Sequence, residues 1–319
     1  MEVTRADLSK ETLDKPTGNT SRPDSRGRGE SGVIHDIGYR HFTGERLGRG
    51  YITRSLYVSS LRGVFGLGRS GKSKLLPLLL SAAMLLPALV IVAIISITNL
   101  TEQPLAYSQY AVALQGIVAI FVAAQSPQLV SHDLRFRTIT LYFARPLERV
   151  DYVFAKYAAL ASALLLLIGV PLLVLYLGGM LAGLPFGRQT AEFGGGLIGA
   201  VILSLLLAGL GLVFAALTPR RGFAVAIVIV VLLVSYGAVN IVSAVAYEEG
   251  NLELAGWIYL FSPVTLYDGA QTFLLNTPSG LIQQPPGTLG GIVFCLFAVF
   301  CVIGAFGILL TRYRRMAAA

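Results

Sequence analysis

The chain has 319 residues, of which 55% are hydrophobic and only 13% are charged, and its mean hydropathy is +0.70. Soluble domains usually carry about 25% charged residues, so this composition excludes an ordinary soluble domain and indicates an integral membrane protein. The formal net charge of +8 does not call for a nucleic acid partner, because a membrane topology accounts for it.

The first 50 residues are polar, rich in Gly, Ser and Arg, and without apolar periodicity, so we expect a disordered tail there. A secretory signal is not expected, because the first apolar segment begins only at Leu75. In residues 51–74, apolar side chains recur at helical spacing between Arg residues, which is typical of an amphipathic helix in the membrane interface. The alternative is a positively charged flank of the first span.

Residues 66–73 read GLGRSGKS and match the GxxxxGK[ST] pattern of phosphate-binding loops. Such a loop needs a buried strand before it, a helix after it and a downstream carboxylate that holds magnesium. The surrounding sequence predicts no strand and runs directly into an apolar segment. We therefore interpret Arg69, Lys72 and Lys74 as anchors on the cytoplasmic side of the first span.

A membrane-spanning helix needs about 20 mainly apolar residues. Windows of this length without Asp, Glu, Lys or Arg predict six transmembrane helices, at residues 75–97, 107–130, 157–180, 193–217, 223–246 and 288–310. Their continuous apolar character lacks the alternation that strands of a membrane barrel show. The predicted fold class is an all-α integral membrane protein. The glycines of residues 193–217 predict that this helix packs deep in the bundle or at a subunit seam.

The distribution of charge predicts the topology. Six spans place both termini on one side, and all of the 25 Lys and Arg residues except Arg188 fall on that side. The other side carries Glu102, Glu192, Glu248, Glu249, Glu253 and Asp268. Basic residues stay on the cytoplasmic side, so we expect a multi-pass protein of the cell inner (plasma) membrane with both termini cytoplasmic.

Residues 247–287 differ from the spans, since aromatic residues and prolines gather there. Aromatic side chains are typical of the membrane boundary, so we expect short re-entrant helices at residues 254–261 and 266–275 that dip into the outer leaflet without crossing it. A crossing here would give seven spans and would strand the basic residues after the last span outside the cell.

Residues 131–156, which we call the 131–156 segment, lie between the second and third predicted spans. The charged residues of this segment are Asp133, Arg135, Arg137, Arg145, Glu148, Arg149, Asp151 and Lys156. Apolar side chains interleave with the arginines, and Pro146 ends the first part. A short helix that exposes both apolar and basic groups suits the docking of a partner protein. The alternative is a plain cytoplasmic loop that follows the charge rule.

The order of residues in this segment resembles the signature between the second and third spans of type-2 ABC transporter permeases. The matching residues are Asp133, Arg137, Thr138, Ile139, Leu141, Tyr142, Ala144, Arg145, Pro146, Arg149, Tyr152 and Lys156. Arg137 stands where Gly or Ser is more usual. The specific part of the resemblance is confined to this segment, and the six-span layout agrees with it.

The resemblance implies a permease subunit that carries no ATPase of its own. Two such subunits, expected to form a homodimer, would pair with two cytosolic ABC ATPase subunits that bind ATP and Mg. The segment would be the coupling helix, and its ATPase-coupling residues would be Asp133, Arg135, Arg137, Arg145 and Arg149. No catalytic residue, metal ligand or cofactor is expected on this chain, and its remaining partner is membrane lipid.

The predicted spans contain no Asp, Glu, Lys, Arg or His. This disfavours a proton-coupled carrier and an intramembrane protease, because both need such groups within the bilayer. Apolar, Gly, Ser, Thr and Asn side chains would line a path suited to an amphipathic or lipid-linked substrate. Export is expected by analogy with the family. The alternative function is a membrane scaffold or assembly factor that transports nothing.

Overall fold

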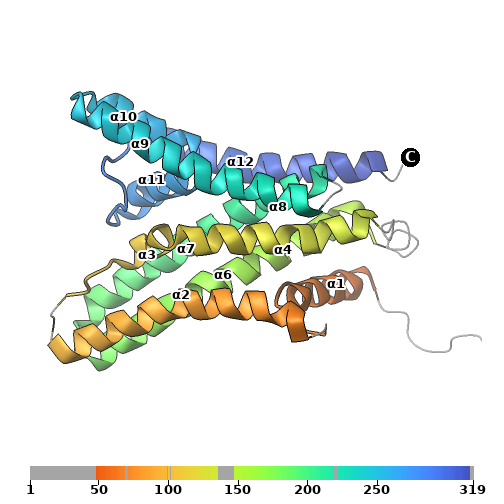
Figure 1. Ribbon diagram of the computed structural model, residues 1–319, viewed down its shortest axis with the longest axis horizontal. Coiled ribbons are helices and arrows are strands. Elements are labelled where there is room, and N and C mark those ends of the chain that lie inside the picture. The colour runs from red at the N-terminus through yellow and green to blue at the C-terminus, as the bar shows by residue number, and fades with distance from the viewer. Residues whose placement is uncertain are drawn as a thin grey trace, which may run out of the picture. The chain divides into compact units, whose positions relative to one another are not determined.

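The computed structural model of the chain describes residues 48–68, 71–98, 100, 102–135, 147–218 and 221–316, which fold into helices without a β-strand (Figure 1). Side chains are described for all of these except residues 131–135, 221 and 315–316. Most of the predicted tail, residues 1–47, lies outside the described residues. The helices are α1 (Arg49–Val64), α2 (Gly71–Thr98), α3 (Tyr107–Ala113), α4 (Gln115–Arg135), α6 (Arg149–Leu181), α7 (Phe186–Leu217), α8 (Arg221–Ile229), the π-helical turn η1 (Val230–Val234), α9 (Ser235–Glu248), α10 (Leu252–Ile258), the 3-10 turn η2 (Tyr259–Phe261), α11 (Pro263–Leu275) and α12 (Gly287–Met316).

Five helical stretches in the described part of the chain are long and apolar enough to cross a membrane: Gly71–Thr98, Arg149–Leu181, Phe186–Leu217, Gly222–Glu248 and Gly287–Arg314. A sixth is obtained when α3 and α4 count as one broken span, because the pair passes the same test together. The chain is therefore a multi-pass, all-α membrane protein, and the fold class predicted from the sequence is confirmed at this level. Each of the six predicted spans falls within one of these stretches.

The second predicted span is not one straight helix, because α3 and α4 meet at Leu114 with an angle of 62°. Two side chains of α3 bind a loop far along the chain. The Ser108 hydroxyl donates to the carbonyl of Pro278 at 2.9 Å, and the Gln109 amide donates to the carbonyl of Ser279 at 2.6 Å. Both partners are 170 residues away, so the contacts that hold α3 at this angle to α4 could not be predicted from the local sequence.

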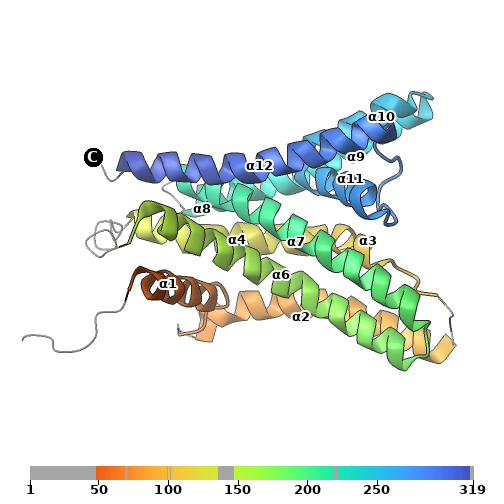
Figure 2. The same cartoon turned by 180° about the vertical axis from the view of Figure 1, so that it is seen from behind.

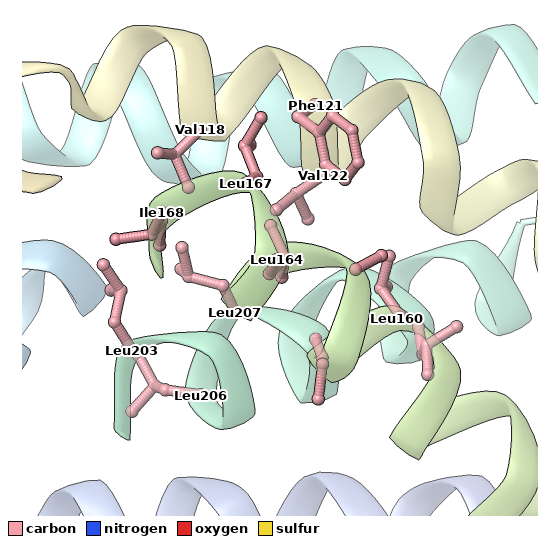
Figure 3. Packing of buried hydrophobic residues seen from close by; sticks show 14 of the residues in the cluster. Val118, Phe121, Val122, Leu160, Leu164, Leu167, Ile168, Leu203, Leu206 and Leu207 are labelled. Carbon is pink, nitrogen blue, oxygen red and sulfur yellow. The ribbon is translucent and has the colours of Figure 1, made fainter. Parts of the chain in front are cut away.

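The helices α6 and α7 form the centre of the bundle. In their most apolar windows 56% and 61% of the residues are buried, whereas the other three single spans bury only 17–22%. Figure 3 shows leucines of α6 and α7 packed together beneath Val118, Phe121 and Val122 of α4. Most of the exposed apolar side chains thus lie on the outer helices, as expected where lipid or another subunit covers them.

Glycines let α7 approach its neighbours closely. A Cβ atom on Gly196 would lie 2.6 Å from the Cβ of Tyr107, and one on Gly211 would lie 2.6 Å from a methyl group of Val122. Both distances are shorter than side chains tolerate, so only glycine allows this spacing without rearrangement. The prediction that residues 193–217 pack deep in the bundle is confirmed.

Two ends of the bundle can be distinguished in Figures 1 and 2. At the first, the junction end, α4 ends, α6 begins and α12 ends. At the second, the opposite end, α3, α10 and α11 lie beside the start of α12. The helices α10 and α11 have seven and 13 residues, too short to cross a bilayer. Helices thus occur where the sequence predicted them, at residues 254–261 and 266–275, and α11 begins earlier because Pro263 occupies its first turn.

The close contact at Gly196 generates a prediction. Gly196→Ala places a methyl group against Tyr107 and should lower the free energy of unfolding by about 1–3 kcal/mol, as overpacking of a core usually does. Gly194→Ala is the matched control, because a Cβ atom there meets nothing within 4 Å on the same helix. Thermal unfolding of the two purified variants measures the difference. Equal unfolding temperatures would contradict the close α3–α7 contact.

Candidate functional site

Three of the five predicted coupling residues lie at the junction end of the described structure. Asp133 and Arg135 belong to the last turn of α4, and Arg149 is the exposed first residue of α6. The other two, Arg137 and Arg145, lie outside the described residues, as does most of the predicted coupling helix. The described part of the 131–156 segment therefore consists of the end of one helix and the start of the next.

The helix α6 begins at Arg149 because two acidic side chains cap it. Glu148 accepts from a backbone amide of the first turn, and Asp151 accepts from the backbone amide of Glu148 at 3.3 Å. This reciprocal pair satisfies backbone donors that a helix start leaves free, and its negative charge suits the positive end of the helix dipole. The charged part of the 131–156 segment thus fixes where the central helix starts.

Arg49, the first residue of α1, binds both capping carboxylates. Its Nη2 donates to an Asp151 oxygen at 2.9 Å, its Nε donates to the other Asp151 oxygen, and its Nη1 bonds to Glu148. A planar guanidinium on a carboxylate in this two-point geometry is among the stronger charged contacts in proteins. These bonds raise the pKa of Arg49 further above its already high value. These side chains are partly exposed to solvent, so the ion pairs add little to the stability of the fold. Their main effect is to fix the position of α1 relative to the start of α6.

Beyond Arg49, α1 is packed along the first half of α6 (Figures 1 and 2). Leu56, Ser60 and Val64 are buried, and the Tyr57 hydroxyl donates to the Ser162 hydroxyl at 3.0 Å. The sequence predicted an amphipathic helix beginning at residue 51, and the helix found here begins at Arg49. Because α1 contacts α6 over this length, the two helices should move as one unit.

The phosphate-loop pattern lies between two helices. Residues 66–68 form a turn after α1, residues 71–73 are the first of α2, and Arg69 lies outside the described residues. Gly66 and Gly68 have positive φ angles of 68° and 87°, which glycine adopts at little cost in a turn. Helices flank the pattern in the described part of the chain, as the sequence predicted.

A second polar cluster, at the opposite end, surrounds a fully buried carboxylate. Asp268 of α11 is 0% exposed and accepts from the Gly280 amide and the Gln271 side chain, each at 3.1 Å, and from the Ser279 hydroxyl. The Gln271 side chain also donates to the carbonyl of Ser108 in α3 at 3.1 Å. Burial raises the pKa of Asp268, while the three hydrogen bonds favour its ionised form. The cluster joins α3, α11 and the loop after α11.

A cavity of about 150 Å³ lies beside this cluster, between the starts of α3 and α7. Arg188 at its rim pairs with Glu102 and Glu192, each at 2.8 Å, and the Tyr107 hydroxyl donates to Gln189 at 2.6 Å. Ligand sites usually measure about 300–1,000 Å³, so this cavity suits a few water molecules better than an organic ligand.

Sequence reasoning missed Arg49 and Asp268. Arg49 fell at the boundary of the predicted tail, and its partners Glu148 and Asp151 are about 100 residues away, so nothing local marks it. Asp268 was counted among the outer acidic residues, although it stands between apolar and aromatic side chains at helical spacing. That placement is the one signal that could have identified a buried carboxylate.

Comparison of the sequence with models of known protein families and with curated proteins finds no match.

The Asp268 cluster yields a prediction. Asp268→Asn keeps the size of the side chain but turns an NH₂ group toward N–H donors, so at least one buried hydrogen bond is lost. A loss of about 1–3 kcal/mol in the free energy of unfolding is expected, with faster hydrogen exchange in residues 276–282. Glu253→Gln, which removes an exposed charge from α10, is the control and should change neither quantity. Unaltered exchange in the Asp268 variant would show that the carboxylate does not hold this loop.

Proposed function

We propose that the chain is the permease subunit of an ATP-driven exporter that resembles the type-2 ABC transporters. Two copies form the membrane domain and bind two separate cytosolic ATPase subunits, which carry ATP and Mg. Both termini lie in the cytoplasm and the protein resides in the cell inner membrane. This chain has no ATPase activity of its own.

The observation that carries the proposal is the residue order of the 131–156 segment. A framework of Asp133, Arg145, Pro146 and Lys156 stands between the second and third spans, where the permeases of this class carry their coupling helix. The arginines give the segment a positive surface that attracts an acidic groove on a partner and fixes its orientation.

The order of helices supports the same assignment. A helix, α1, precedes the first span; the segment follows the broken pair α3 and α4; and two short helices, α10 and α11, stand before the last span. In the proposal α1 lies at the cytoplasmic interface, and α10 and α11 are the re-entrant helices of the outer leaflet.

Coupling would act through α6. Movement of an ATPase on the 131–156 segment pulls on the first turn of α6, which is capped by Glu148 and Asp151 and tied by Arg49 to α1. The body of α6 packs on α7, and α7 contacts α3 and α11 at the far end. The movement of α6 at the cytoplasmic side is thereby transmitted to the outer cluster around Asp268, through helices that are already in contact.

An amphipathic or lipid-linked molecule is the proposed substrate. The six predicted spans contain no Asp, Glu, Lys or Arg, and wide apolar faces of α2, α9 and α12 are exposed. Such surfaces offer little to a small hydrated ion but accommodate a molecule with an acyl or polyprenyl portion.

The proposal is tested by purifying the chain from its native membrane and identifying the proteins that accompany it. An ABC ATPase should co-purify and should hydrolyse ATP in proteoliposomes that contain both chains. Arg145→Glu should weaken its binding about tenfold or more, because a negative charge then faces the acidic groove. Asp133→Lys should weaken binding as well, because the cation of the partner that pairs with Asp133 would then face a like charge.

Two controls make the result specific. Arg188→Glu reverses a charge at the opposite end and should leave the ATPase bound, and Arg145→Lys should retain most of the binding. Failure to recover an ATPase, or recovery that is insensitive to both reversed charges, would contradict the proposal and favour a membrane scaffold.

A further inference from the structure

A groove runs between α1 and α6 at the junction end. Its volume is about 560 Å³, within the range of about 300–1,000 Å³ that is usual for ligand sites. Its walls are formed by Arg49, Gly50, Thr53, Arg54, Tyr57, Asp151, Phe154 and Ala155. The groove is open on one side, along a helix that is long and apolar enough to span the membrane.

The groove has both charged and apolar walls. Arg49 and Asp151 line it at the start of α6, and Arg54 lies farther along α1, between Arg49 and Tyr57. Tyr57, Phe154 and Ala155 form the apolar wall beside Arg54. The Tyr57 hydroxyl donates to the Ser162 hydroxyl at 3.0 Å, so the Tyr57 ring is held along α6 beyond Phe154 and Ala155. Phe154 is 58% exposed, which is unfavourable in water and favourable against an acyl chain.

The two arginines of the groove differ in their partners. Arg49 is neutralised by Glu148 and Asp151, but Arg54 is exposed and has no ion-pair or hydrogen-bond partner among the described residues. The helix α1 contains no acidic residue that could compensate it. Among the described residues, the groove therefore offers one cationic group without a partner, that of Arg54, to a phosphate.

We propose that the groove between α1 and α6 binds one anionic phospholipid, with its phosphate on Arg54 and one acyl chain along Phe154 and Tyr57. A cationic side chain beside an exposed apolar wall matches this class of molecule in both charge and shape. The inference requires only that the chain span a membrane and is independent of the proposed transport function. Bound lipid would stabilise α1 against α6 beside the capped start of the central helix.

Native mass spectrometry of the purified full chain, titrated with phosphatidylglycerol or phosphatidylcholine, tests the site. One phosphatidylglycerol per chain should bind preferentially, and Arg54→Gln should weaken its binding about fivefold, the value of one basic residue near an anionic lipid. Arg62→Gln is the matched control, since it removes the same charge from α1 outside the groove and should leave the affinity unchanged. Phe154→Ser should weaken binding of both lipids.

Three results of the lipid titrations would overturn the proposal. They are equal binding of the two lipids by the wild type, equal effects of Arg54→Gln and Arg62→Gln, and full competition by glycerol phosphate, which has no acyl chain. Lipid that binds only after residues 1–47 are deleted would also overturn it, because the groove would then belong to the N-terminal segment. Unfolding temperatures of all variants, measured without added lipid, identify any that fail to fold.

Discussion

Close packing of α6 against α7 is the interaction on which the rest of the bundle depends. Between apolar helices in a bilayer the hydrophobic effect gives little drive, so association relies on van der Waals contact and on hydrogen bonds. Gly209 lets Tyr157 of α6 lie against α7, where its hydroxyl donates to the carbonyl of Leu205 at 2.6 Å. The other spans are arranged around this pair and bury much less of their own surface.

The sequence predicted the helices better than their arrangement. Each span could be found because bilayer thickness and the cost of buried charge act locally, on about 20 consecutive residues. The break at Leu114 could not, since it depends on Ser108 and Gln109 bonding to a loop 170 residues away. The same reason hid the pairing of Arg49 with Asp151. The residue order of the 131–156 segment predicted a site, but residues 136–146 lie outside the described part of the chain.

Two groups of ion pairs among the described residues lie at opposite ends of the bundle. Arg49 pairs with Glu148 and Asp151 and so ties α1 to the start of α6. Arg188 of α7 pairs with Glu192 on the same helix and with Glu102, and so ties the start of α7 to the segment that precedes α3. The two central helices are thus anchored by ion pairs at opposite ends, while the contact between them consists of apolar side chains and uncharged hydrogen bonds such as that from Tyr157 to Leu205. Movement at one end of this pair can reach the other end through helices in contact, as the proposed coupling to a separate ATPase needs.

The central claim of this account is that the 131–156 segment faces the cytoplasm. In a variant whose Cys295 and Cys301 are replaced by Ala, a single cysteine at Arg145 or at Glu102 can be labelled in intact cells with a membrane-impermeant maleimide. The account predicts that the Glu102→Cys protein is labelled directly and the Arg145→Cys protein only after the membrane is permeabilised. The reverse pattern would contradict the topology, the coupling site and the proposed function together.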